Sequence, residues 1–514
     1  MKFYHVDFEP VGRRGKCRDD ESLLDCARRL GVGIISLCGG TGKFHCCKVQ
    51  ILKGSLSEPT SNERESFSPQ ELKNGYRLAC QTYMRSDCKV RIPLESLTTP
   101  QRIQVEGLEV SLNRKPSISP YHIQVSSSSL SDLRADEERI IETLNRQYKL
   151  HCRSIDIDVL RNISPLLRSW NWEAQISLRG NEVIAISPWP THQLGLAIDL
   201  GTTKIAGYLL DLSSGQTLAA EGIMNPQISY GEDIVSRITY AIDSSAKAIK
   251  LQEVVVKALN QLVTNLCSRA NAKLEEIVEA VIVGNTAMHH LLLGLPVQQL
   301  AFSPFVPAVR RALEVKARDI DLSIAPGAYV HLLPNIAGFV GADHVAMLLA
   351  TEGIWKDESL VIAMDIGTNT EVSLIDNGEI SSVSCASGPA FEGAHIKDGM
   401  RAANGAIERL QLINDQVNYE TIGGVPPVGL CGSGILDAIA QLYLAGVINR
   451  DGRISNHARV RIHEGQPEFV LVGQEERDSS AAITITQKDV REIQLAKGAI
   501  RSGINVLLQE RSYS

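Results

Sequence analysis

The stretch LAIDLGTTK, residues 196–204, is the most informative segment of this chain. An apolar run reaches a carboxylate, then a glycine and two hydroxyl side chains, before a second apolar run begins, and this order predicts a β-hairpin. Asp199, at the end of the first strand, can hold a hydrated Mg²⁺ ion through one carboxylate. Gly201 lets the backbone approach a phosphate closely. The hydroxyls of Thr202 and Thr203 and the N–H groups of the turn can then bind phosphate oxygens.

The same pattern recurs in IAMDIGTNT, residues 362–370. Asp365 takes the place of the first carboxylate, and Gly367, Thr368 and Asn369 take the places of the turn residues. Two such hairpins predict two similar half-domains that clasp the phosphates of one nucleotide, each supplying one carboxylate. The alternative is a pair of ordinary hairpins that use glycine only to turn.

Composition narrows the classes of function. The chain has 514 residues, enough for about three domains, and its net charge of −7 is unlike that of a general nucleic-acid binder. The sequence contains no apolar run long enough to cross a bilayer and no secretory signal, so we expect neither a nucleic-acid partner nor a membrane. Eleven cysteines, seven of them within the first 88 residues, indicate metal or redox chemistry in a reducing compartment, and we expect a cytoplasmic protein.

Residues 1–97 have the pattern of a small domain that holds an iron–sulfur cluster. The order is strand, turn, strand, a helix over 22–30, and then a glycine-rich loop that ends in paired cysteines. Glycines leave room for a cluster, and loop N–H groups can bond its sulfides. A further cysteine lies in the later stretch RLACQT. The cysteine of that stretch, Cys80, could supply a distal iron ligand.

This segment resembles a 2Fe–2S ferredoxin domain with ligand spacing C-x5-C-x2-C and a distant cysteine within R-L-A-C-Q. Three ligand positions match: Cys38, Cys47 and Cys80. Phe44 stands at the second ligand position and cannot bind iron. Three interpretations stay open. In the first, Cys46 replaces the missing ligand, and the predicted iron ligands are Cys38, Cys46, Cys47 and Cys80. In the second, His45 or another unusual group is the ligand, and in the third the domain is degenerate and holds no cluster.

Residues 98–125 read as an extended linker, and residues 126–191 as a small α/β module. We expect helices over 132–147 and near 156–167, followed by a pair of strands over 170–186. No constellation in this module indicates catalysis. Its expected role is to position the redox domain relative to the nucleotide-binding domain.

The C-terminal domain spans residues 192–514. Two further segments of it contain residues that could contact a nucleotide. Asn285 follows a predicted strand at 280–283 and precedes a helix, where α/β proteins usually bind ligands, so it is a candidate near the γ-phosphate or its attacking water. The Gly-Ser-Gly sequence at 432–434 opens a helix predicted over 438–444 and allows backbone contact with an adenosine or α-phosphate. Helix capping is the alternative explanation at these positions. The sequence has no Walker A motif.

In this order, the two hairpins and the Gly-Ser-Gly helix start resemble the ATPase superfamily of actin, hexokinase and heat-shock chaperones. The resemblance implies a duplicated ribonuclease-H-like fold that binds ATP with Mg²⁺, and hence an α/β multidomain protein with a small α+β, ferredoxin-like (β-grasp) start. Asp199 and Asp365 would bind or orient the metal and the attacking group, and Asn285 is the third catalytic candidate. The phosphates and the adenosine side would be contacted by Gly201, Thr202, Thr203, Gly367, Thr368, Asn369, Gly432, Ser433 and Gly434.

The whole arrangement is similar to the reductive activators of corrinoid proteins. The matching stretches lie at 284–288, 388–393, 399–402, 430–434 and 487–489. The resemblance implies an enzyme that takes an electron from a low-potential donor through its cluster. It would use ATP to return cob(II)alamin to cob(I)alamin on a corrinoid protein of a methyltransferase system. A homodimer is an open option.

Two other functions are compatible with the sequence. Phe44 favours an ATP-binding regulatory or docking protein whose ferredoxin domain has lost its cluster. A small-molecule kinase is the third hypothesis, although no substrate base or pocket stands out in the sequence.

Overall fold

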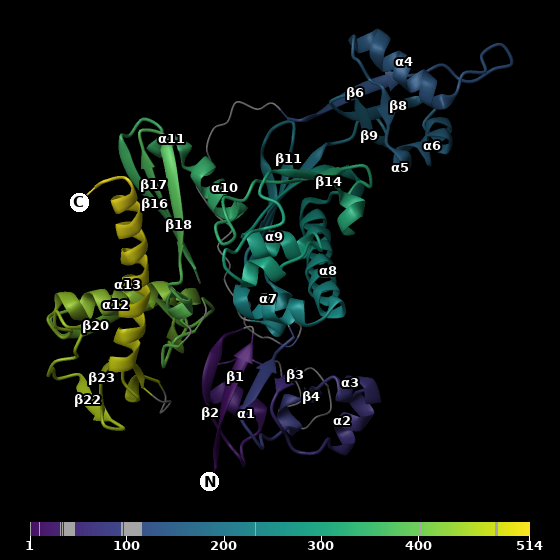
Figure 1. The fold of residues 1–514 in the computed structure, drawn as a ribbon. Coiled ribbons are helices and arrows are strands. Elements are labelled where there is room, and N and C mark those ends of the chain that lie inside the picture. The colour runs from purple at the N-terminus through teal and green to yellow at the C-terminus, as the bar shows by residue number, and fades with distance from the viewer. Residues whose placement is uncertain are drawn as a thin grey trace. The chain divides into compact units, whose positions relative to one another are not determined.

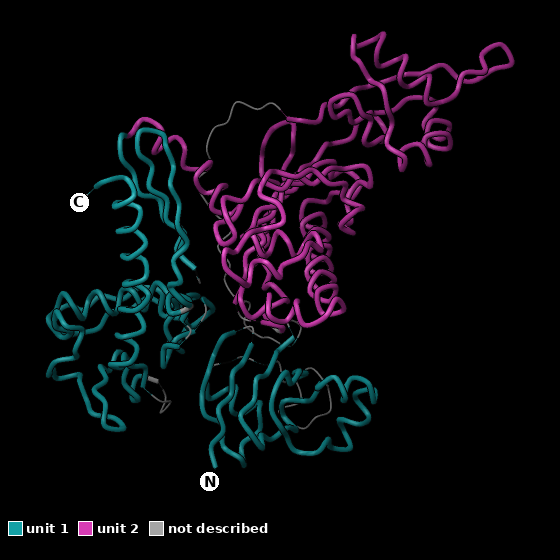
Figure 2. The backbone as a smooth tube through the Cα atoms, in the orientation of Figure 1, with its two compact units in different colours: residues 1–102, 359–514 teal, residues 103–358 magenta. Residues whose placement is uncertain are grey.

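The computed structural model describes two compact units, residues 1–102 with 359–514 and residues 103–358 (Figure 2). The division lies between Glu358 and Ser359, inside the range that we expected to form one ATPase domain, and each half of that range has a hydrophobic core of its own. None of the described helices is long and apolar enough to cross a membrane. The described residues are 2–9, 11–30, 32, 34, 47–93, 96, 116–231, 233–367, 369–393, 395–400, 402–477 and 482–513.

The ferredoxin-like part of the first unit is a mixed sheet with the strand order β2-β1-β5-β3-β4 (Figure 1). β1 and β5 pair in parallel and the other neighbours are antiparallel, which confirms the predicted β-grasp pattern. Ser22 caps the first helix by accepting the N–H of Asp25, and the apolar face of that helix is buried with Phe8 and Val90. The elements are β1 (Phe3–Glu9), β2 (Arg13–Arg18), α1 (Leu23–Arg29), β3 (Lys48–Lys53), α2 (Ser61–Ser66), α3 (Pro69–Lys73), β4 (Tyr76–Leu78), η1 (Ala79–Gln81) and β5 (Cys88–Arg91).

The second unit begins with a small α/β module whose sheet has the order β6-β8-β9-β7. Residues 118–124, which we expected in the linker, form β6 and pair with β8 because Ile118 and Ile123 are fully buried. Asp156 accepts two hydrogen bonds from Arg318, at 2.8 and 3.0 Å, and so links the module to the rest of the unit. The elements are β6 (Ile118–Gln124), α4 (Asp136–Tyr148), β7 (Ser154–Ile155), α5 (Ile157–Leu160), α6 (Ile163–Ser169), β8 (Glu173–Arg179) and β9 (Glu182–Ser187).

The main sheet of the second unit has the order β12-β11-β10-β13-β15-β14. β10, β13 and β15 are parallel to one another, so their carboxyl ends lie at the same edge of the sheet. The elements are β10 (Leu194–Leu200), β11 (Lys204–Asp211), β12 (Thr217–Met224), η3 (Pro226–Tyr230), α7 (Ile234–Asp243), α8 (Ser245–Ala270), η4 (Leu274–Glu276), β13 (Ile277–Val283), α9 (Thr286–Leu292), η5 (Gln298–Ala301), β14 (Leu313–Lys316), η6 (Ala317–Ile320), β15 (Tyr329–Leu332), α10 (Ala342–Ala350) and α11 (Glu352–Trp355).

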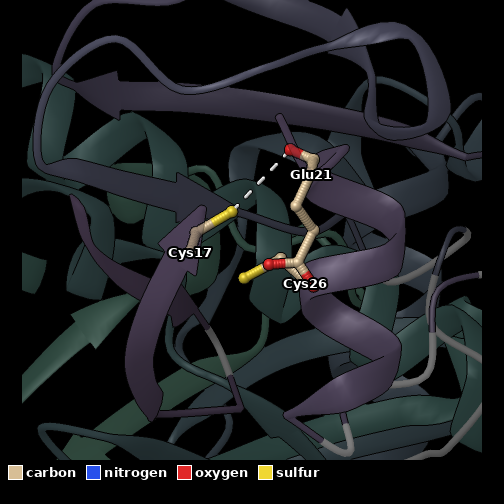
Figure 3. A group of neighbouring side chains, drawn as sticks. All are labelled: Cys17, Glu21 and Cys26. Carbon is tan, nitrogen blue, oxygen red and sulfur yellow. Dashed lines mark hydrogen bonds between the residues drawn. The ribbon is translucent and has the colours of Figure 1, made fainter. Parts of the chain in front are cut away.

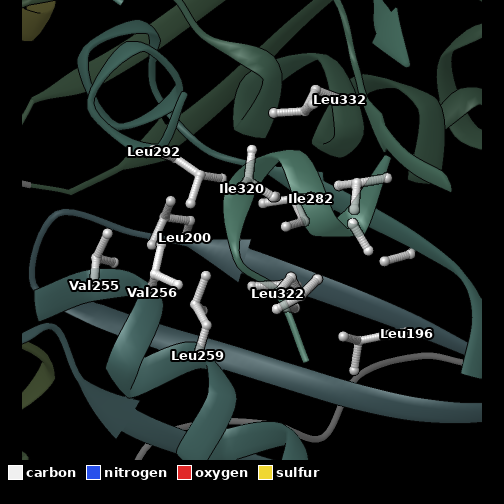
Figure 4. Close-up of a cluster of buried hydrophobic side chains, with 14 of the residues drawn as sticks. Leu196, Leu200, Val255, Val256, Leu259, Ile282, Leu292, Ile320, Leu322 and Leu332 are labelled. Atoms are coloured by element: carbon white, nitrogen blue, oxygen red, sulfur yellow. The ribbon is translucent and has the colours of Figure 1, made fainter. Parts of the chain in front are cut away.

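The long helix α8 provides much of the core of this unit. Its apolar residues recur at helical spacing, so that Val255, Val256 and Leu259 lie on one side and face the apolar side chains of the sheet (Figure 4). On β10, the buried residues alternate along the strand, and Leu196 and Leu200 contribute to the same cluster (Figure 4). The core therefore holds β10 against α8 and fixes the position at which β10 ends.

The C-terminal part of the first unit contains separate sheets, β16-β17-β18, β20-β19-β21 and β22-β23-β24. Leu507 of the last helix packs on Val372 and Leu374. Residues 487–490 begin that helix, and Thr486 and Asp489 form the capping box at its start. The elements are β16 (Leu360–Ile366), β17 (Thr370–Asp376), β18 (Glu379–Cys385), η7 (Pro389–Glu392), β19 (Ala406–Ile413), β20 (Gln416–Thr421), η8 (Ile422–Gly424), β21 (Gly429–Leu430), α12 (Gly432–Leu444), β22 (Val460–His463), β23 (Gln466–Val472), η9 (Glu475–Arg477), β24 (Ile483–Thr486) and α13 (Gln487–Glu510).

The two predicted hairpins are confirmed, and each begins an antiparallel meander. β10 pairs with β11 and β11 with β12, and β16, β17 and β18 repeat this order in the other unit. The pairing closes at Leu200–Ile205 in the first hairpin and at Ile366–Thr370 in the second. The aspartate therefore stands one residue before the end of the first strand in both.

The core of the second unit can be tested at α8. Leu259 is fully buried, so Leu259→Ala should lower the free energy of unfolding of this unit by about 2–5 kcal/mol, because it leaves a cavity. Urea denaturation followed by circular dichroism measures the change. Ile249 lies on the same helix and is 55% exposed, so Ile249→Ala should change it by less than about 0.5 kcal/mol. Equal effects of the two substitutions would contradict this placement of α8.

Candidate functional site

The first hairpin presents a tight turn at the edge of the main sheet. Leu200 pairs with Ile205, and the turn residues stand between them. A Cβ atom at Gly201 would lie 2.5 Å from the carbonyl oxygen of Lys204, so any side chain here would force the turn open. Asp199, just before the turn, is exposed and can reach a hydrated metal ion.

Asn285 is brought directly to this turn. It follows β13, which is parallel to β10 and pairs Val283 with Asp199. Its side-chain oxygen accepts the N–H of Met288 at 3.0 Å and caps α9, while its Nδ2 donates to the hydroxyl of Thr202 at 2.8 Å. Asn285 thus caps α9, which was the alternative explanation from the sequence, and it also contacts the turn; its role near the γ-phosphate stays a prediction. Because the Thr202 hydroxyl accepts this bond, its own proton can be donated elsewhere.

A third loop joins the same edge of the sheet, between β15 and α10. The hydroxyl of Thr286 donates to the carbonyl of Ala337 at 2.6 Å, and the N–H of Ala342 donates to the carbonyl of Gly284 at 2.9 Å. Gly341 is needed because a Cβ there would lie 2.3 Å from the Cα of Asn285. The sequence analysis did not single out this loop, whose contacts join segments far apart in the chain.

The second hairpin has a similar turn in the other unit. The N–H of Gly367 donates to the carbonyl of Asn369 at 3.1 Å, and Asp365 precedes the turn. Ser387, shortly after β18, donates to the carbonyl of Gly367 at 3.4 Å and shares a 2.8 Å hydrogen bond with the hydroxyl of Thr370. Thr368, a predicted phosphate contact, lies outside the described residues.

The Gly-Ser-Gly sequence forms the start of α12. A Cβ at Gly432 would lie 1.8 Å from the carbonyl oxygen of Phe391, and one at Gly434 would lie 2.0 Å from that of Ile407. Both glycines are therefore required for helix packing, whatever else they contact. Ser433 lies with its hydroxyl 3.4 Å from the sulfur of Cys431. Contact of this segment with adenosine stays a prediction.

The ferredoxin-like domain brings two of the predicted iron ligands together. The sulfur atoms of Cys47 and Cys80 are 3.4 Å apart, and both residues are buried. Two thiolates at this separation fit ligation of one iron atom, because metal–sulfur bonds measure about 2.3 Å. Cys88 is bound elsewhere, since its thiol donates to the carbonyls of Ser86 and Ser55, and burial raises its pKa to about 11. The other predicted ligands, Cys38 and Cys46, and Phe44 lie outside the described residues.

Glu63, which the sequence analysis missed, holds the segment that carries Cys80. Its carboxylate accepts from the guanidinium of Arg77 at 2.8 and 3.0 Å, from the N–H of Leu78 at 3.0 Å and from the hydroxyl of Thr82 at 3.1 Å. These partners lie on both sides of Cys80 in the chain. The capping-box spacing of Thr60 and Glu63 was a signal in the sequence, but it gave no sign of the distant partners.

A second group of cysteines lies in the same domain, where Cys17 and Cys26 flank Glu21 (Figure 3). Their ligand-type atoms lie within 4.8 Å of one another. Arg29, however, donates to both oxygens of Glu21 at 2.8 Å and lies 3.7 Å from the sulfur of Cys26. A cation already neutralises the carboxylate and stands beside a thiol, so we interpret these cysteines as core residues.

Comparisons with known proteins show to which class of protein this chain belongs. Family descriptions match almost the whole chain: "2Fe-2S iron-sulfur cluster binding domain" at 6–85, "RACo linker region" at 107–193, "RACo middle region" at 194–353, and "C-terminal domain of RACo the ASKHA domain" at 359–514. The chain thus joins a domain of the 2Fe-2S cluster-binding family to an ASKHA domain, which confirms the predicted fold class.

Similarity to individual proteins identifies the family of the chain. The chain is 32% identical over 503 residues to a corrinoid activation enzyme, RamQ, of Eubacterium limosum, covering 95% of this chain and 80% of the relative. It is 24% identical to a methylated amine-specific corrinoid protein reductase of Methanosarcina barkeri, over 62% of this chain and 59% of that protein. A solved reductive activator for a corrinoid, iron–sulfur protein matches with a TM-score of 0.69 and 32% identity, covering 99% of this chain and 84% of the other. The chain belongs to the RACo family of reductive activators of corrinoid proteins.

The substitution Glu63→Gln tests whether Glu63 holds the segment that carries Cys80. Removing one partner of a buried ion pair should lower the free energy of unfolding of the ferredoxin-like domain by about 3–5 kcal/mol. Urea denaturation of the purified chain measures it. Glu71 holds the same capping-box position in the neighbouring helix α3 but is partly exposed, so Glu71→Gln is the matched control and should change little. If Glu63→Gln lowered the free energy of unfolding no more than Glu71→Gln does, Glu63 would not be the residue that holds the Cys80 segment.

The contribution of Glu63 should also depend on pH in one direction. Burial raises the pKa of its carboxyl, but the hydrogen bond from Arg77 and those from backbone N–H groups outweigh burial and lower the pKa below 4.5. The stabilisation is therefore complete above that value and is lost as the pH falls through the lowered pKa of the folded state. The difference between the parent chain and Glu63→Gln should stay constant from about pH 7 to about pH 5 and shrink below it. A difference that grew on acidification would contradict this assignment.

Proposed function

We propose that this chain is an ATP-dependent reductive activator that returns the cobalt of a partner corrinoid protein from the cob(II) to the cob(I) state. The observation that carries the proposal is the match, over nearly the whole chain, to proteins named for corrinoid activation. The converging thiols of Cys47 and Cys80 and the repeated hairpins support its two chemical parts.

The nucleotide part assigns roles to the hairpin residues. Asp199 and Asp365 would hold Mg²⁺ and its water ligands, and the turns that follow them would bind phosphate oxygens. Asn285, hydrogen-bonded to Thr202, would orient the attacking water. Phosphoryl transfer needs positioning and charge neutralisation more than covalent catalysis, and these residue types supply both. The phosphate and adenosine contacts are proposed at Gly201, Thr202, Thr203, Gly367, Thr368, Asn369, Gly432, Ser433 and Gly434.

The redox part rests on the cysteines of the ferredoxin-like domain. Cys47 and Cys80 would hold a 2Fe–2S cluster together with Cys38 and Cys46, and such a cluster supplies one-electron transfer from a low-potential donor. The protein buries both described sulfurs and so limits their contact with water.

ATP is needed because the reduction of cob(II) is thermodynamically uphill. In a one-electron couple, each tenfold change in the equilibrium corresponds to about 59 mV. A nucleotide that binds one conformation of the activator better than another shifts the population toward that conformation, and this shift can favour the reduced state of the bound partner. We therefore expect cob(I) formation to require Mg²⁺-ATP.

Substitution of the two aspartates should separate the nucleotide part from the cluster. Asp199→Asn and Asp365→Asn should each lower ATP turnover by roughly 10²-fold, because each removes a group that neutralises transition-state charge. Phosphate release measures turnover, and the absorbance of cob(I) measures partner reduction. The iron content should stay that of the parent chain. Unchanged turnover in both variants, or cob(I) formation without nucleotide, would refute the coupling.

The converse variants test the cluster. Cys47→Ser and Cys80→Ser should lose iron and sulfide from anaerobically purified protein while ATP turnover is kept, and Cys88→Ser, whose thiol is bound elsewhere, is the matched control. Iron and sulfide assays with a visible spectrum give the result. A parent chain without iron would instead favour the regulatory or docking function that Phe44 suggests.

A further inference from the structure

Three successive carbonyl groups of the first phosphate turn, those of Gly201, Thr202 and Thr203, accept hydrogen bonds from the segment that follows β12 and from α7. Asn225, the residue after β12, donates from Nδ2 to the carbonyl of Gly201 at 2.8 Å and from its backbone N–H to that of Thr203 at 3.0 Å. The carbonyl between them, of Thr202, accepts from the guanidinium of Arg237 on α7. Both anchoring side chains are buried.

This arrangement fixes the direction of the N–H groups. In a planar trans peptide, the carbonyl of one residue and the N–H of the next point in opposite directions. Because the carbonyls of Gly201 and Thr202 point toward Asn225 and Arg237, the N–H groups of Thr202 and Thr203 point away from them. The turn therefore presents donors outward, on the side that an anion would approach.

The anchors are themselves held rigidly. Arg237 is fully buried, and its Nε donates to the carbonyl of Gly231 at 2.9 Å. The side-chain oxygen of Asn225 accepts the N–H of Gln227 at 3.0 Å, and Gln227 donates to the carbonyl of Leu251 on α8 at 3.0 Å. The guanidinium also places a positive charge directly behind the turn, which favours an anionic ligand.

The second hairpin has the same kind of side-chain hydrogen bond to its turn glycine, but the donor is a serine. Ser387, which like Asn225 follows the third strand of its meander, donates to the carbonyl of Gly367, the counterpart of Gly201. An ordinary hairpin would not need a side-chain hydrogen bond to the carbonyl of the same turn glycine in both units. Its recurrence there points to a role in what the turns bind.

We propose that Asn225 and Arg237 are positioning residues that orient the first turn for the phosphates of a nucleotide. The inference rests on the proposed function, because it assumes that this turn binds Mg²⁺-ATP. The two residues act through the backbone and contact no phosphate themselves. Their removal should therefore weaken binding of the phosphates and leave recognition of the nucleoside unchanged.

The test compares two conservative variants in the full chain. Arg237→Lys keeps the positive charge but cannot reproduce the planar fork that bonds Thr202 and Gly231 together. Asn225→Ser adds no charge and keeps a side-chain oxygen that can accept from Gln227, but it removes the Nδ2 donor to Gly201 and to the sulfur of Met288. Arg269→Lys is the matched control, because Arg269 is exposed on α8 and donates to a backbone carbonyl, that of Ala220, outside the turn.

Equilibrium dialysis should be carried out with Mg²⁺-ATP and, separately, with adenosine. Each turn variant should bind Mg²⁺-ATP about tenfold to a hundredfold more weakly, the loss typical of a hydrogen bond to a charged group, while its affinity for adenosine stays within about twofold of the parent chain. Arg269→Lys should bind both ligands as the parent does. Circular dichroism establishes that each variant is folded.

Three results would overturn the inference. Equal affinity of the parent and Asn225→Ser for Mg²⁺-ATP would refute positioning while leaving the proposed function intact, and this variant decides the matter if Arg237→Lys does not fold. Parallel losses for ATP and adenosine would show a general structural role. No binding of Mg²⁺-ATP by the parent chain would refute the proposed function itself, and with it this inference.

Discussion

The parallel pairing of β10 with β13 is the constraint on which the nucleotide part depends. It sets Asp199 opposite Val283, so that the chain leaving β13 meets the turn leaving β10 and Asn285 can bond Thr202. A register slip of one residue would turn every side chain of β10 to the other face and would bury the aspartate. The core between the sheet and α8 prevents that slip, since the alternate residues of β10 are apolar and enclosed.

Both candidate sites use the same physical means of support. Near the thiols, the buried carboxylate of Glu63 bonds the backbone and side chains on either side of Cys80. At the first phosphate turn, buried amide and guanidinium groups bond three successive carbonyls. A buried polar group that lost these partners would be strongly destabilising, so each anchor can adopt few alternative positions. The segments that carry the candidate sites are thereby held in place by buried polar groups as well as by the adjoining strands and helices.

Local signals made much of this fold predictable. An apolar run, an aspartate and a glycine-threonine turn predicted both hairpins, and cysteine spacing predicted the ferredoxin-like domain. Asn225, Arg237 and Glu63 could not be predicted, because each acts on a segment distant in the sequence and stands in a stretch of ordinary composition.

The glycines that open α12 have a consequence for how relatives of this protein should be interpreted. Gly432 and Gly434 face carbonyl oxygens so closely that even a methyl group would collide, whether or not a nucleotide is bound. Natural selection for folding alone would keep both of them in a descendant that did not bind the proposed nucleotide. Their persistence among homologues is therefore a poor sign of nucleotide binding, whereas replacement of the exposed Asp199, the proposed magnesium ligand, would be a better sign that the proposed activity had been lost during evolution.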